Sequence, residues 1–160
     1  MNATAETFRS ALLTAVIALA FAPVTVRAEH KPASSIPAAA LVQPATLAAQ
    51  LKVQAQPAVV ILQVGSRALF DQAHIPGAVY AGPAGQPEGL PVLKSAVEKL
   101  PKDAPILIYC GCCPWSRCPN IAAAFDELQA LKFTRVSVLY IAENFGADWV
   151  DHGYPVAAPD

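Results

Sequence analysis

Short β-branched runs alternate along this chain with segments in which hydrophobic residues recur every three or four positions. The runs at 57–64 (PAVVILQV), 105–110 (PILIYC) and 135–140 (RVSVLY) are typical of strands. Two segments between them have helical spacing. Their hydrophobic positions are Leu90, Leu93, Val97 and Leu100 in the first, and Ile121, Phe125, Leu128 and Leu131 in the second. Strands that alternate with helices predict an α/β fold, a central parallel β-sheet flanked by helices on both faces.

All four cysteines fall in one loop, YCGCCPWSRCPN at 109–120. Cys110 is the last residue of a predicted central strand, and Cys112, Cys113 and Cys118 follow it. Ligands of open parallel sheets bind beyond the carboxyl ends of the strands. We therefore expect the cysteine loop to form the functional site.

The N-terminus has the pattern of a secretory signal. An apolar run at 11–22 follows Arg9, and Val26 and Ala28 provide the small residues that a signal peptidase reads. The run is shorter than the roughly 20 apolar residues that span a bilayer. We predict a cleaved signal peptide at 1–28, and hence a periplasmic or secreted protein that has no membrane contact after cleavage.

The segment 29–40 is rich in proline, alanine and serine, and it predicts a flexible tether. The net charge of the chain is −1. A nearly neutral surface argues against nucleic acid or anionic lipid as a partner. We expect a monomer with one folded domain.

Several motifs carry a resemblance to a known family. AHIPGAVY at 73–80, a strand that ends in YC, LKF at 131–133 and WVDHGYPV at 149–156 occur in this order. This combination resembles the rhodanese-like family, here with an atypical cysteine-rich active loop, CGCCPWSRCPN. The resemblance assigns the domain to 41–156, with LVQPATLAAQL as its first strand and helix, and leaves 157–160 as a tail.

The resemblance implies a sulfurtransferase or persulfide carrier. In this family a cysteine at the end of a strand accepts sulfane sulfur as a persulfide and passes it to cyanide or to another thiol. Cys110 matches that cysteine, and Arg117 matches the arginine of the active loop. The implied partners are a small sulfur-containing anion and a protein thiol acceptor, and no cofactor or metal is implied. His74 and Gly77, in the HIPGA motif, are expected to shape a turn.

The chain departs from the family pattern at two positions before the HIPGA motif. Gln63 and Gly65 stand where the family usually has an aspartate and an arginine.

The active loop departs in length as well. Six residues separate Cys110 from Arg117, whereas four are common in the family and four separate Cys112 from Arg117. Cys112 is therefore an alternative nucleophile.

A nucleophilic cysteine must ionise, which requires positive charge or oriented N–H groups nearby. Pro119 suits the first turn of a helix, whose free amides would point back towards the loop. Arg117 adds a guanidinium group that could bind an oxyanion. These features predict a catalytic pair, with a stabilised thiolate at Cys110 and an anion-binding Arg117.

The roles of the other thiols stay open. Cys112, Cys113 and Cys118 could resolve a persulfide, and a Cys110–Cys118 disulfide could form in an oxidising compartment. That bond would make the domain a thiol–disulfide redox module. Clustered thiolates also suit Cu(I), and C-x-C-C-x4-C crowds four ligands more closely than structural zinc sites do.

Overall fold

The structure is a computed structural model that describes residues 35–53 and 59–158. The expected signal peptide (1–28) and the first part of the expected tether (29–34) lie outside these residues. Within the two described ranges, no helix has both the length and the apolar character that spanning a membrane requires.

Five strands form one sheet in which all neighbours are parallel, in the order β1-β5-β4-β2-β3. The strands are β1 (Leu41–Val42), β2 (Val60–Gln63), β3 (Val79–Tyr80), β4 (Ile106–Tyr109) and β5 (Val136–Leu139). The parallel sheet predicted from the sequence is confirmed. β4 is the middle strand, so the loop that follows it leaves the centre of the carboxyl edge of the sheet.

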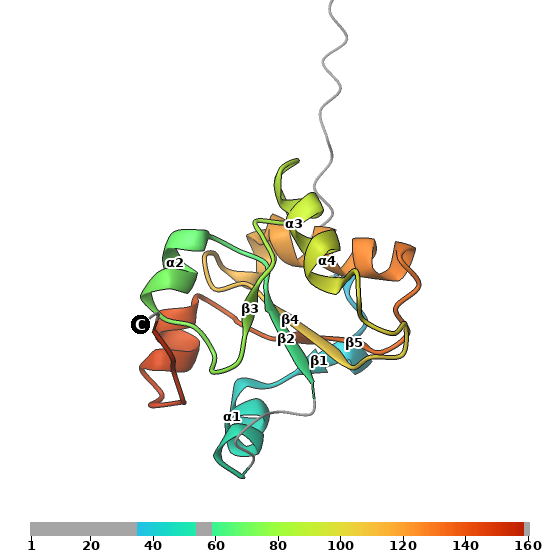
Figure 1. Cartoon of the computed structure of the whole chain (residues 1–160). Helices are drawn as coiled ribbons and strands as arrows, with labels where there is room; N and C mark the ends of the chain where they lie inside the picture. The colour runs from blue at the N-terminus through green and yellow to red at the C-terminus, as the bar shows by residue number, and fades with distance from the viewer. Residues whose placement is uncertain (1–34, 54–58, 159–160) are drawn as a thin grey trace, which may run out of the picture.

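Helices cover both faces of this sheet (Figure 1). The helical elements are α1 (Pro44–Val53), α2 (Arg67–Gln72), α3 (Gly89–Val97), α4 (Pro119–Ala130), the short 3-10 helices η2 (Ala38–Ala40) and η3 (Trp115–Arg117), and the π-helix η4 (Gly146–Val150). α3 and α4 pack on one face, and α1 and η4 pack on the other.

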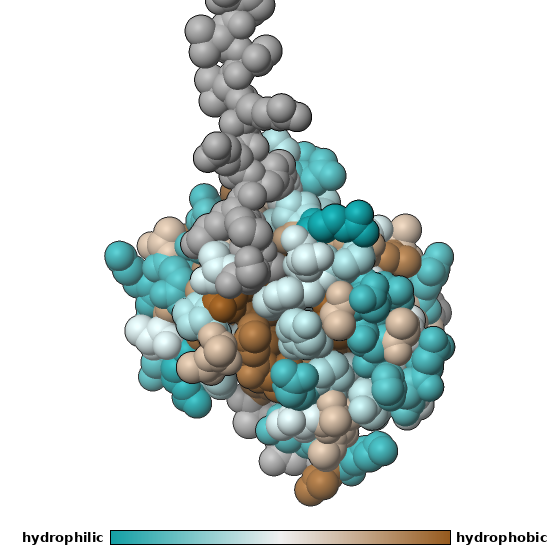
Figure 2. Space-filling view, turned by 180° about the vertical axis from the view of Figure 1, so that it is seen from behind, coloured by the Kyte–Doolittle hydropathy of each residue, from teal (hydrophilic) through white to brown (hydrophobic). Residues whose placement is uncertain are grey.

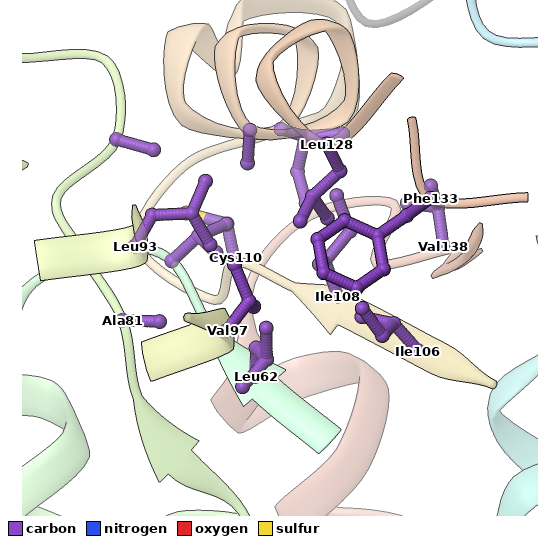
Figure 3. Close-up of a cluster of buried hydrophobic side chains, with 14 of the residues drawn as sticks. Leu62, Ala81, Leu93, Val97, Ile106, Ile108, Cys110, Leu128, Phe133 and Val138 are labelled. Atoms are coloured by element: carbon purple, nitrogen blue, oxygen red, sulfur yellow. The ribbon is translucent and has the colours of Figure 1, made fainter. Parts of the chain in front are cut away.

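Strand β4 contributes to both hydrophobic clusters because successive side chains of a strand point to opposite faces. Leu107 and Tyr109 belong to the cluster beneath α1 and η4. Ile106, Ile108 and Cys110 belong to the cluster beneath α3 and α4. Figure 3 shows the Cys110 side chain grouped with the apolar side chains of that second cluster. The alternation that builds the core therefore also turns Cys110 inwards.

The folded domain extends past both of the boundaries expected from the sequence. Ile36 lies in the expected tether, yet it is only 7% exposed and belongs to the cluster beneath α3 and α4. Burial of an apolar side chain removes it from water, which favours this packed arrangement. Ala157, expected in the tail, pairs its backbone with His74. Residues 36–40 and 157 therefore belong to the domain.

Among the described residues, a few large hydrophobic side chains are exposed to solvent. They are Val53, Leu69, Val79, Val92, Val150 and Val156. Figure 2 shows a hydrophobic area near the middle of the back face, with polar side chains around it. Leu69 and Val150 come from α2 and η4, far apart in sequence, and both border the cavity described next.

Candidate functional site

The cysteine loop begins where β4 ends and finishes where α4 begins. Cys110 follows β4 directly and is 2% exposed. Pro119 is the first residue of α4, as predicted, where its missing N–H and restricted backbone suit the first turn. Cys118 occupies the N-cap position. The loop therefore lies against the N-terminus of a helix, whose dipole is positive there.

Contacts with the segment after β5 hold this loop in place. The Phe145 amide donates to the Gly111 carbonyl at 3.1 Å, and the Trp115 amide donates to the Ala142 carbonyl at 2.9 Å. A side chain at Gly111 would collide with Phe145, so only glycine allows this approach. The Trp115 ring packs against Tyr140 with centroids 5.0 Å apart. The segment that follows β5 thus fixes the backbone that carries the thiols.

Three thiols of the loop converge on one point. The sulfur atoms of Cys110 and Cys112 are 3.1 Å apart, and those of Cys112 and Cys113 are 3.5 Å apart. All three sulfur atoms lie within 4.8 Å of one another. Cys118 is close enough to Cys110 to affect its pKa. All four cysteines are free thiols in the structure.

Asn120 binds two of these sulfur atoms from the first turn of α4. Its amide Nδ2 donates to the sulfur atoms of Cys110 and Cys112 at 3.4 Å each, and its Oδ1 accepts from the Gly85 amide at 2.8 Å. Asn120 is 6% exposed. No sequence motif assigns a role to this residue. The available signal was a polar side chain at the start of a helix that otherwise buries apolar residues.

Gly65 makes room for the cluster on the side of β2. A Cβ atom there would lie 2.8 Å from the Cys110 sulfur and 3.6 Å from the Cys112 sulfur. Gln63, buried beside it, accepts a hydrogen bond from the Gly65 amide at 3.2 Å. The departure from the family pattern at position 65 therefore makes room for the cluster, because a long side chain there would occupy the space that the thiols fill.

The pKa values of the four thiols shift in different directions. Hydrogen bonds to Cys112, Cys113 and Cys118, together with burial, hold the pKa of the Cys110 thiol well above its usual range. The hydrogen bond from Cys110 lowers the pKa of Cys112 and that of Cys113. For Cys118, the hydrogen bond from Cys110 is again the largest cause, and its pKa falls to about 7.

These directions favour a protonated Cys110, whereas the sequence led us to expect a thiolate there. Cys110 and Cys118 are both buried, but Cys110 is the thiol that donates hydrogen bonds to the others, and these bonds raise its pKa more than burial does. The sequence placed Cys110 correctly at the end of its strand, but it did not show which of four neighbouring thiols would be covered by α3 and α4.

A cavity of about 460 Å³ opens in front of Cys112. Its lining comes from the end of α2, the cysteine loop, and η4 with the two residues before it: Leu69, Gln72, Ala73, Gly111, Cys112, Asn144, Phe145, Gly146 and Val150. Cys112 is exposed and is the cysteine in this lining, whereas Cys110 lies beneath it. No lysine or arginine lines the cavity.

Arg117, the other predicted catalytic residue, is exposed at the end of η3. It is not part of the cavity lining. Among the described residues, no hydrogen bond or ion pair joins its guanidinium group to a thiol of the cluster. The structure thus brings the four cysteines together but leaves Arg117 outside their arrangement.

The HIPGA segment makes contacts of a structural kind. His74 Nδ1 lies 2.8 Å from the Phe70 carbonyl oxygen, and the two rings stack with centroids 4.0 Å apart. Gly77 has φ +78°, a conformation that favours glycine. The Ile75 amide donates to the Tyr109 hydroxyl at 3.2 Å, which joins this segment to the end of β4. None of these contacts reaches a thiol.

Comparison with known proteins gives one family match. The family model for the rhodanese-like domain matches residues 44–140, more than half of the chain. No curated protein matches the sequence significantly.

Three solved structures illustrate the structural likeness. A rhodanese-like domain from Anabaena has 22% identity and a TM-score of 0.57, and the match covers 75% of this chain and 80% of that one. A Rhodopseudomonas palustris protein of unknown function, described as a possible tyrosine phosphatase, has 25% identity and a TM-score of 0.51, with 78% and 86% covered. A thiosulfate sulfurtransferase from Pseudomonas aeruginosa has 28% identity and a TM-score of 0.51, with 74% of this chain but 19% of that one covered.

The hydrogen bond from Cys110 to Cys112 predicts how fast Cys112 is alkylated at a given pH. Cys110→Ala removes the thiol that donates to Cys112, whereas Cys110→Ser keeps a hydroxyl donor in its place. Loss of a donor to a thiolate raises its pKa, so less of Cys112 ionises at neutral pH and its alkylation slows. Alkylation rates measured against pH, with peptide mapping by mass spectrometry, should show an upward-shifted midpoint at Cys112 in Cys110→Ala and a smaller shift in Cys110→Ser. Identical profiles for wild type and Cys110→Ala would contradict this arrangement.

Proposed function

Because this chain belongs to the rhodanese-like domain family, we propose that it carries sulfane sulfur as a persulfide on a loop cysteine. The observation that supports this function most is the position of Cys112. Its thiol faces a cavity large enough for a small molecule, and two further thiols lie 3.1 Å and 3.5 Å from its sulfur atom. A reactive thiol at the mouth of a cavity is what a sulfur carrier needs.

Cys112 is the sulfur-accepting residue in this proposal, in place of Cys110. The attacking species in such reactions is the thiolate, and it must reach the donor. Cys112 is exposed and its pKa is lowered, whereas Cys110 is buried and retains its proton. The alternative left open by the loop spacing is thus the one that the geometry favours.

The transfer consists of two displacements at sulfur. The Cys112 thiolate attacks the outer sulfur of a donor persulfide, R–S–SH, so that a new S–S bond forms and the R–S⁻ thiolate leaves. The outer sulfur of the resulting Cys112 persulfide is then attacked by an acceptor thiolate, which regenerates the Cys112 thiolate and releases the acceptor persulfide. No electrons are gained or lost overall.

The buried proton on Cys110 protects the loaded state. If the Cys110 sulfur attacked the Cys112 persulfide, a Cys110–Cys112 disulfide would form and sulfide would be lost. A protonated thiol is a poor nucleophile, and the hydrogen bonds to its neighbouring thiols, together with burial, raise the pKa of Cys110 and so favour its protonated form. The same S–H group stabilises the Cys112 thiolate by donating to it. One hydrogen bond therefore activates one thiol and restrains the other.

The cavity favours an organic donor over an inorganic one. Thiosulfate carries two negative charges, and its binding calls for cations or several N–H donors. The lining contains apolar and amide side chains but no cationic one, and Arg117 stands outside it. An organic persulfide, free or on a partner protein, could instead pack its carbon atoms against Leu69 and Val150.

The proposal places this protein outside the cytoplasm. The signal peptide at 1–28 and a periplasmic or secreted location for a monomeric protein stay predictions. The oxidising conditions outside the cytoplasm would require a reductant or a bound sulfur to keep the four thiols from pairing.

Persulfide loading tests the assignment of the nucleophile. Cys112→Ser should abolish loading from a low-molecular-weight persulfide, because a hydroxyl neither ionises at neutral pH nor accepts sulfur. Cys110→Ser and Cys113→Ser, as matched controls, should each keep loading within about tenfold of wild type, since Cys112 remains exposed at the cavity. The measurement is cyanide-labile sulfur per protein after reduction, donor treatment and desalting. Loading that survives in Cys112→Ser but disappears in Cys110→Ser would return the active site to Cys110.

Donor preference tests the role of the uncharged cavity. Gln72→Lys places an ammonium group in the lining at an exposed position, and Gln72→Met is the matched neutral control. We expect wild type to use an organic persulfide in preference to thiosulfate. Gln72→Lys should raise kcat/KM for thiosulfate by about tenfold, the effect of one added ionic hydrogen bond of roughly 1.5 kcal/mol. Efficient use of thiosulfate by wild type, together with its loss in Arg117→Ala, would show that Arg117 binds the donor after all.

A further inference from the structure

The three converging thiols also form a set of metal ligands. Cys110, Cys112 and Cys113 each provide one sulfur atom, and these atoms lie within 4.8 Å of one another. No histidine, aspartate or glutamate of the described residues belongs to this group. The donor set is therefore sulfur alone, which selects soft metals and disfavours magnesium, calcium and manganese.

The spacing of the sulfur atoms fits a three-coordinate site. Zinc–thiolate bonds are about 2.3 Å long. If the metal–sulfur bonds have that length and the coordination is trigonal planar, the three sulfur atoms lie about 4 Å from each other. The observed separations of 3.1 Å and 3.5 Å are somewhat smaller, and the upper bound of 4.8 Å is somewhat larger. Side-chain rotations that move each sulfur atom by less than about 1 Å would bring the three sulfurs to that spacing. Each cysteine could then remain in a staggered rotamer.

Cys118 does not complete a tetrahedron. Its thiol is near those of Cys110 and Cys113, but it does not belong to the group of three whose sulfurs all lie close to one another, and at the N-cap of α4 it interacts with the Ile121 amide. Structural zinc sites are almost always tetrahedral with four ligands. Cu(I) shares the preference for thiolates and accepts three ligands. We propose that Cys110, Cys112 and Cys113 form a three-thiolate Cu(I) site.

The surroundings of the three sulfurs suit an anionic centre. One Cu(I) ion and three thiolates carry a net charge of −2, which needs compensation inside a protein. The Asn120 amide donates to the sulfur atoms of Cys110 and Cys112. The N-terminus of α4 adds the positive end of its dipole. Hydrogen bonds of this kind orient the ligands of a metal and tune the site.

The cavity gives the ion a path to the site. Cys112 is exposed there, so it can accept Cu(I) first, by ligand exchange with a donor complex. Cys113 and the buried Cys110 then complete the coordination. Binding displaces up to three protons from the thiols and leaves the oxidation state of copper unchanged. The same sulfur would carry the persulfide, so bound copper and bound sulfur exclude each other.

Competition for Cu(I) tests this site directly. The reduced full-length chain is titrated anaerobically with Cu(I) against a chromophoric Cu(I) chelator. We expect one ion per chain. Cys113→Ser should weaken binding by at least about tenfold, because it removes one of three ligands. Cys118→Ser should stay within about threefold of wild type, since serine is a good N-cap and lies outside the ligand set. X-ray absorption of the copper complex should show three sulfur neighbours.

Two results would overturn the site. Equal losses in Cys113→Ser and Cys118→Ser would indicate a four-thiol centre, and equal affinities in wild type and Cys113→Ser would indicate a two-coordinate ion. Persulfide loading of the same variants keeps this test separate from the proposed function. Cys113→Ser should still load sulfur while it binds copper weakly, so either activity can fail without the other.

Discussion

The contact between a buried and an exposed thiol organises the whole site. The sulfur atoms of Cys110 and Cys112 are 3.1 Å apart. Strand alternation turns Cys110 into the core beneath α3 and α4, where an ionised sulfur would lose its hydration. Hydrogen bonds to the neighbouring thiols and this burial raise the pKa of Cys110, while the hydrogen bond from Cys110 lowers the pKa of Cys112 at the open cavity. The packing of the sheet thus sets the two thiols in different environments.

Much of the fold follows from local sequence patterns. The β-branched runs correspond to β2, β4 and β5, and the segments with helical spacing correspond to α3 and α4. Pro119 is the first residue of α4, as predicted. These signals were readable because each segment buries enough apolar side chains to show a period. α2 and β3 escaped prediction because six residues and two residues are too short to show one. Their positions depend on the sheet that they join.

The chemistry of the site depends on contacts between distant segments, which no local pattern reveals. Gly65 leaves space for the thiols from β2, and Asn120 donates to two sulfur atoms from α4. The cavity is lined by residues of α2, the cysteine loop and η4, which are far apart in the sequence. The sequence therefore located the cysteine cluster but assigned the thiolate to Cys110 and gave Arg117 a place at the donor. Hydrogen bonds among the thiols and burial favour a protonated Cys110, and η3 holds Arg117 outside the cavity lining.

In the proposed function, Cys112 is the thiol that receives sulfur, and Cys110 stays a protonated neighbour. A high-resolution crystal structure of the wild-type chain, soaked with an organic persulfide under anaerobic conditions, tests this most directly. We predict additional electron density for one sulfur atom on Cys112, directed into the cavity, with Cys110 unmodified beneath it. Additional density on the Cys110 sulfur, with Cys112 unmodified, would contradict the account.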